Sequence, residues 1–131
     1  MSEPVEEAFA LFSPVGEKAW VPGWEPELIH PPETEWAEGQ IFRSAGTLHP
    51  AMWVVARLEK YRATYYRWEM PDLVVSVDVK CEPAAERSTR VTVGYTFVSL
   101  STAGDEAIAS MNDSDYEQKM REWKRMIEQR R

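Results

Sequence analysis

Several segments within residues 39–100 show a side-chain pattern with a period of two, and this pattern restricts the fold more than any other feature of the sequence. The alternation is clearest from Leu73 to Cys81, where every second residue is apolar. A period of two is typical of a strand with one buried face, and β-branched and aromatic residues favour strands. We therefore predict five strands, at 40–44, 51–59, 63–70, 73–81 and 89–100.

The linkers between these strands are short. Only residues 71–72 separate the third predicted strand from the fourth, and residues 82–88 separate the fourth from the fifth. Parallel neighbours need a crossover of about a dozen residues or more. Sequential strands with short linkers usually pair with each other, so we expect an antiparallel meander.

Helices are predicted on both sides of the strand region. Short helices are expected at 4–12 and 14–20, followed by an irregular, proline-rich loop at 21–38. Residues 101–130 are predicted to be helical with a break at 112–114, re-capped by Asp113 or Ser114. After the break, the apolar residues form a single stripe of Tyr116, Met120, Trp123 and Ile127. We expect this stripe to lie across the apolar face of the sheet.

Length and charge limit the classes of function. The 131 residues correspond to a single domain spanning 1–131. A formal net charge of −7 argues against binding to nucleic acid or to anionic membranes. No apolar run approaches the roughly 18 residues of a membrane span, and the acidic N-terminus does not resemble a targeting signal. We expect a cytoplasmic protein that binds neither nucleic acid nor membrane.

Few residues are suited to metal or nucleophilic chemistry. His30, His49 and Cys81 are the only histidines and cysteine, and no pair has the spacing of metal ligands. Cys81 ends the inward-facing alternation, which favours a small core residue over a nucleophile. The sequence holds neither a nucleophile elbow nor a glycine-rich phosphate loop. We expect no metal, no cofactor, and two exposed loop histidines.

The segment 8–26 reads AFALFSPVGEKAWVPGWEP. It resembles the Ala-Phe-x-Leu-Phe-(Ser/Thr)-Pro-x-Gly-Glu-x-x-Trp-x-Pro-Gly-Trp stretch of small bacterial START-like (SRPBCC) proteins, some of them loosely described as polyketide cyclase or dehydrase relatives. The similarity continues through residues 38–42, 53–55, 90–95 and 122–123, and so covers nearly the whole chain.

The resemblance implies an α+β, helix-grip fold, in which a strongly curved antiparallel sheet wraps around a long C-terminal helix and leaves a cavity between them. In that family a further strand precedes the segment that matches 4–9 and pairs with the last strand. Only Met1, Ser2 and Glu3 precede it here, so this strand is missing or truncated. An unpaired strand edge invites association, and we expect either a homodimer through the edge strand 89–100 or a pair of chains that exchange a strand.

Such a cavity implies binding of a small hydrophobic ligand, lipid-like, aromatic or polyketide-like, with no assigned reaction. Trp20 and Trp24 flank Pro22-Gly23 and are the sharpest candidates, because indoles can stack on a flat ligand and donate their N–H. Simple packing in the core is the alternative interpretation. The candidate ligand-binding residues are Trp20, Trp24, Trp53, Tyr66, Trp68, Tyr95, Phe97, Met120 and Trp123.

Two other functions stay open at this point. One is a polyketide cyclase- or dehydrase-type enzyme, in which Arg67 and Glu69 face inward beside Tyr65 and assist proton transfer. An exposed cross-strand ion pair is the favoured interpretation of these two charges, and alternation leaves the face of Arg57 undecided. The other is a protein-interaction module with a filled interior, which uses the unpaired edge and the aromatic surface.

Overall fold

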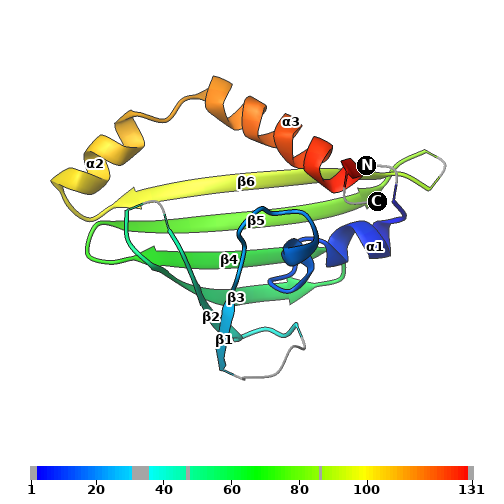
Figure 1. Ribbon diagram of the computed structural model, residues 1–131, viewed down its shortest axis with the longest axis horizontal. Coiled ribbons are helices and arrows are strands. Elements are labelled where there is room, and N and C mark those ends of the chain that lie inside the picture. Colours follow the sequence, from blue (N-terminus) through cyan, green and yellow to red (C-terminus); the bar gives the residue numbers. More distant parts are fainter. Residues whose placement is uncertain (1–2, 31–35, 47, 86, 130–131) are drawn as a thin grey trace.

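The computed structural model describes residues 3–30, 36–46, 48–85 and 87–129. It is an α+β structure with one six-stranded antiparallel sheet and helices before and after it (Figure 1). The strands are β1 (Glu27–His30), β2 (Ile41–Ser44), β3 (Ala51–Glu59), β4 (Arg62–Glu69), β5 (Leu73–Pro83) and β6 (Thr89–Ser99). Their order in the sheet is their order in the chain, which confirms the predicted meander.

The strand β1 lies inside the segment that was expected to be an irregular loop. It pairs with β2 through Leu28 and Phe42, and its register shifts between Leu28 and His30. A strand of four residues is too short to show an alternating pattern in the sequence. Pairing with β2 is what makes this segment extended, so the prediction of a loop over all of 21–38 is wrong for its middle.

The core lies on one face of the sheet, called here the inner face. On β5 this face carries Leu73, Val75, Val77, Val79 and Cys81, and each of these side chains is at most 6% exposed. Their neighbours on the strand turn to the opposite, outer face. The predicted alternation of 73–81 is therefore confirmed.

A β-bulge in β3 decides the orientation of Arg57. Val55 pairs with Tyr65, but the next paired residue is Arg57, opposite Thr64, with Ala56 skipped. Because a bulge adds one residue to one strand, the residues after it exchange faces. Arg57 is therefore exposed on the outer face, and Leu58 turns inward opposite Ala63.

The N-terminal segment contains the helix α1 (Val5–Ala10) and a 3₁₀ helix, η1 (Gly16–Ala19). The second predicted helix is thus a single tight turn. A Cβ atom on Gly16 would lie 1.9 Å from the Ala10 carbonyl oxygen, so only glycine fits this approach. Phe9, Phe12 and Trp20 of this segment are buried in the core.

The chain ends in the helices α2 (Thr102–Ala109) and α3 (Asp113–Gln129), which extend along β6 in Figure 1. The predicted break between them is confirmed, but its cap is Asn112, whose side-chain oxygen accepts a hydrogen bond from the Asp115 N–H at 2.9 Å. Ile127 is fully buried, and Trp123 packs on the rings of Phe12, Trp20 and Tyr95. None of the described helices is long and apolar enough to cross a membrane.

Candidate functional site

A cavity of about 170 Å³ lies between the N-terminal segment, the inner face of the sheet and α3. Five of the predicted ligand-binding residues line it: Trp20, Trp24, Trp53, Tyr95 and Trp123. The other lining residues are Phe12, Pro14, Glu17, Val21, Phe42, Ala45, Tyr65, Arg67, Val77, Val79 and Lys119. This cavity weighs against the alternative interpretation that requires a filled interior.

A groove of about 570 Å³ adjoins the cavity, between β6 and the two C-terminal helices. Arg67, Tyr95 and Lys119 line both spaces, so the cavity and the groove are neighbours on either side of these three residues. Small-molecule sites typically measure about 300–1,000 Å³. The cavity alone is too small for that range, whereas the groove falls within it, with or without the cavity.

Two further predicted residues, Phe97 and Met120, line the groove and a separate hollow, respectively. Phe97 lines the groove and stacks on Tyr95, with ring centroids 5.8 Å apart. Met120 lines neither the cavity nor the groove. It borders a separate hollow of about 360 Å³ between β6 and α3.

Tyr66 and Trp68 do not line the cavity, contrary to the prediction. They lie on the outer face, where they are 41% and 37% exposed. The cavity forms on the face of Tyr65 and Arg67, and alternation turns the neighbouring residues of β4 the other way. The alternation along β4 already places these two aromatic residues on the face opposite to that of Tyr65.

Three of the four tryptophans that line the cavity donate their indole N–H groups within the protein. Trp20 donates to the Leu11 carbonyl at 2.8 Å, Trp24 to the Pro14 carbonyl at 2.7 Å, and Trp53 to the Ser44 hydroxyl at 2.8 Å. The expectation that Trp20 and Trp24 donate to a ligand is therefore wrong. What these side chains offer to the cavity is the apolar surface of their rings.

Arg67 and Glu69 face inward, and the interpretation as an exposed cross-strand pair is wrong. Their side chains are 16% and 0% exposed, and Arg67 Nε lies 3.0 Å from Glu69 Oε2 along the same strand. The guanidinium carbon is 5.4 Å from the centroid of the Trp53 ring, which is a cation–π contact. Arg67 is thus held between a buried carboxylate and an aromatic face.

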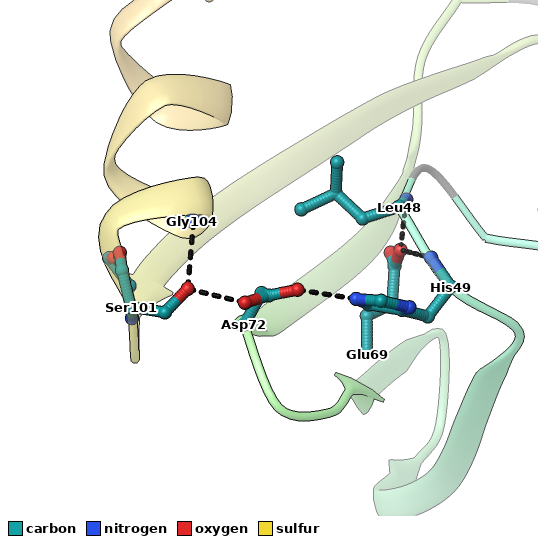
Figure 2. Close-up of polar contacts among 7 residues, drawn as sticks. Leu48, His49, Glu69, Asp72, Ser101 and Gly104 are labelled. Atoms are coloured by element: carbon teal, nitrogen blue, oxygen red, sulfur yellow. Dashed lines mark hydrogen bonds and ion pairs between the residues drawn. The ribbon is translucent and has the colours of Figure 1, made fainter.

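Hydrogen bonds to its Oε1 atom, which belong to a polar network, hold the Glu69 carboxylate in place (Figure 2). Its Oε1 accepts hydrogen bonds from the backbone N–H of Leu48, at 2.7 Å, and of His49, at 3.2 Å. The His49 ring contacts Asp72, which in turn accepts from the Ser101 hydroxyl. These hydrogen bonds from Ser101 and His49 lower the pKa of Asp72.

The histidine, aspartate and serine of this network do not form a nucleophilic triad. The carboxylate lies between the imidazole and the hydroxyl, so His49 is not in contact with Ser101 and cannot take its proton. His49 is half-buried and bonded, rather than the exposed loop residue that was expected, whereas His30 is exposed. The network is a structural support for Glu69 and for the start of α2.

Glu17 is a cavity residue that sequence reasoning missed. Its side chain lines the cavity, and burial raises its pKa to about 8, so the carboxyl group is mainly protonated at neutral pH. Its charge contributes to the raised pKa values of Tyr65 and Tyr95, which places all three groups within electrostatic range. Nothing in the sequence distinguishes this glutamate from one in the first turn of an exposed helix.

Lys119 was also missed, although the sequence held a signal for it. It is exposed, but it lies three residues after Tyr116 and four before Trp123, which places it beside the apolar stripe. Its Nζ lies 4.9 Å from the Tyr95 ring centroid and 5.9 Å from that of Trp123. Burial, and secondarily the charge of Arg67, lower its pKa.

Other chemistry has little support in the described part of the chain. Cys81 is buried, and burial raises its pKa to about 11, so it is a neutral thiol in the core. Among the described residues, no group of three or more His, Cys, Asp or Glu side chains is placed to hold a metal ion.

Comparisons with models of known protein families, with curated proteins and with solved structures found no match. The function is therefore inferred from the geometry of the cavity and the groove.

Proposed function

We propose that this protein binds a small hydrophobic molecule in the space formed by the cavity and the groove, as a START-like domain of the helix-grip type would. The observation that carries the proposal is that the cavity and the groove border each other, with Arg67, Tyr95 and Lys119 lining both. Aromatic rings with internally bonded N–H groups form much of the wall, so transfer of apolar surface out of water would supply the driving force, at about 25 cal/mol per Å².

The experiment is the binding of N-phenyl-1-naphthylamine, a neutral dye whose fluorescence rises in apolar surroundings. Val77 lines the cavity on β5, so Val77→Phe places an extra ring volume inside it. We expect this variant to weaken dye binding at least about tenfold and to retain a cooperative thermal transition. Val74→Phe is the matched control, because Val74 lies on the outer face of the same strand.

Native mass spectrometry of freshly purified protein gives a second, probe-free readout, since a bound molecule would add its mass to the chain. Wild-type protein that neither retains a small molecule nor binds the dye would refute the proposal. Equal loss of dye binding in the Val77 and Val74 variants would also count against the cavity as the site.

A proton-transfer enzyme of the cyclase or dehydrase type is the second candidate, and Glu17 is the observation that favours it. Glu69 is held by two backbone N–H groups and Arg67, whereas the Glu17 carboxyl accepts no hydrogen bond from the described residues. A protonated Glu17 could donate its proton to a ligand carbonyl and regain one from the adjacent carbon, which converts a ketone to its enol.

The test of this second candidate is methyl hydrogen–deuterium exchange of 2-acetylnaphthalene in D₂O, followed by NMR. We expect Glu17→Gln to abolish enzyme-dependent exchange and Glu25→Gln, at an exposed loop position, to retain it. An unchanged exchange rate in the presence of wild-type protein would rule this reaction out.

A further inference from the structure

We propose that the hydrophobic ligand carries a carboxylate, and that this anion binds between Arg67 and Lys119, where the cavity and the groove border each other. The inference rests on the proposed function, because it names the chemical class of the molecule that occupies the same space. It assigns to these two cations a role that packing alone does not require.

The guanidinium of Arg67 is oriented before any ligand arrives. Glu69 holds its Nε side, and the ring of Trp53 supports it at 5.4 Å. No described residue accepts a hydrogen bond from the guanidinium, although it lines both the cavity and the groove. A planar guanidinium with free terminal N–H groups matches the two oxygens of a carboxylate.

Lys119 supplies a second cation at the same place. Its ammonium group lies over the rings of Tyr95 and Trp123, and it forms no ion pair with a carboxylate in the described part of the chain. The charge of Arg67 acts on Lys119 and helps to lower its pKa, so two like charges lie within electrostatic range of each other. An anion between them would relieve this repulsion.

The local charge balance also favours an anion, although the whole chain has a net charge of −7. The negative charge of Glu69 is paired with Arg67, and Tyr65, Tyr95 and Glu17 are neutral near pH 7. Lys119 then remains as an uncompensated positive charge. Asp113 and Asp115 also line the groove and are exposed, as Lys119 is, but neither forms an ion pair with Lys119.

The experiment compares 2-naphthylacetate with 2-naphthylacetamide, two ligands of nearly equal shape that differ in charge, by isothermal titration calorimetry at pH 7. We expect wild-type protein to bind the acid at least about tenfold more tightly than the amide, as charge-assisted hydrogen bonds are stronger than neutral ones. Lys119→Gln should reduce this preference about tenfold and leave amide binding nearly unchanged.

Two variants separate a local role of Lys119 from a general effect of charge or folding. Lys119→Arg keeps the positive charge and should restore most of the preference for the acid. Lys18→Gln removes the same charge from an exposed position that lines neither space, and should retain the preference in full.

The possible failures can be told apart. Binding of N-phenyl-1-naphthylamine without any preference for 2-naphthylacetate over its amide would overturn this inference and leave the proposed function standing. An equal loss of preference in the Lys18 and Lys119 variants would overturn it as well. Absence of binding for all three compounds would refute the proposed function and the carboxylate site together.

Discussion

The surroundings of Glu17 disfavour a negative charge on its carboxyl group. The side chain projects into a cavity walled by aromatic rings, no described residue donates a hydrogen bond to its carboxyl group, and burial raises its pKa from 4.5 to about 8. A carboxyl group in this position gains no stability from ionising. A neutral acid facing the cavity is what the proton-transfer candidate requires.

The first prediction concerns the pH dependence of stability. An unfolded chain releases the Glu17 proton near pH 4.5, whereas the folded chain holds it to about pH 8. The folded state therefore binds more protons between these values, and its free energy of unfolding falls as the pH rises through this window. We expect Glu17→Gln to flatten that fall and to be more stable than wild type at pH 9 by several kcal/mol, at about 1.4 kcal/mol for each pH unit between the two pKa values.

Urea unfolding at pH 4, 7 and 9 measures this effect, with Glu25→Gln as the exposed control. A carboxyl ¹³C signal of Glu17 that titrates below pH 5 would contradict the prediction directly.

The sequence alone does not show which charged residues line the cavity, and the reason is physical. A period of two tells which residues of a strand share a face, and it correctly joined Tyr65, Arg67 and Glu69. It does not tell which face becomes the inner one, because that depends on where the helices pack. The orientation of Glu17 depends on a tight turn around Gly16, which leaves no periodic signal.

At the scale of the elements, the start of α2 is held by contacts with the turn between β4 and β5. Ser101 caps it by accepting a hydrogen bond from the Gly104 N–H at 3.1 Å, and the same hydroxyl donates to Asp72 in the turn between β4 and β5. A Cβ atom on Gly104 would lie 2.2 Å from the Asp72 carbonyl oxygen, so the helix start and the turn are in close contact. Because α2 contributes Ile108 to the lining of the groove, the shape of the groove depends on this contact between the helix start and the turn.

The second prediction is that Ser101→Ala destabilises the protein by about 1 kcal/mol, the usual cost of losing an N-cap, and loosens α2. Amide hydrogen exchange should become faster in the first turn of α2, while the central strands stay protected. Ser110→Ala is the matched control, because Ser110 is exposed at the other end of α2 and bonds only to the Ala107 carbonyl. Equal effects of the two substitutions would show that the cap is unimportant.

The strands were predicted more accurately than the helices because each strand carries its own pattern. The bounds of β3, β5 and β6 differ from the expected ranges by at most two residues. In contrast, β1 exists through its pairing with β2, and the bulge in β3 inserts a residue that alternation cannot reveal. Strand pairing and β-bulges depend on contacts with neighbouring strands, so the sequence of one strand gives little sign of them.

At the scale of the whole molecule, the sequence does not determine whether a cavity remains between the sheet and the helices. The same aromatic residues are compatible with a solid core and with a wall, since both bury apolar rings. The difference lies in how far α3 stands from the sheet: Ile127 is fully buried, whereas Tyr116 near the other end of the helix is 39% exposed. The groove opens at that less buried end, next to Asn112 and Asp113.

We propose, as the third prediction, that a second copy of the chain associates through β6. This strand of eleven residues ends the sheet, and among the described residues no strand pairs with its outer edge. Two other segments contact β6: the Val93 carbonyl accepts a hydrogen bond from the Tyr116 hydroxyl of α3, and the Thr89 hydroxyl donates to the Glu3 carbonyl. Unpaired strand edges recruit further strands unless a charge or a covering element prevents it.

Light scattering at about 100 µM should then give twice the chain mass of 15.1 kDa. Gly94 is at the middle of β6, and no atom lies within 4 Å of a Cβ built there, so a side chain fits without disturbing the fold. Antiparallel pairing of two β6 strands about their midpoint brings the two Gly94 residues together, and Gly94→Lys would place like charges opposite each other. This variant should shift the mass toward the monomer, whereas Gly94→Thr, which adds a neutral strand-forming residue, should remain dimeric. A monomeric wild-type chain at this concentration would mean that the contacts of α3 and of Glu3 protect the edge.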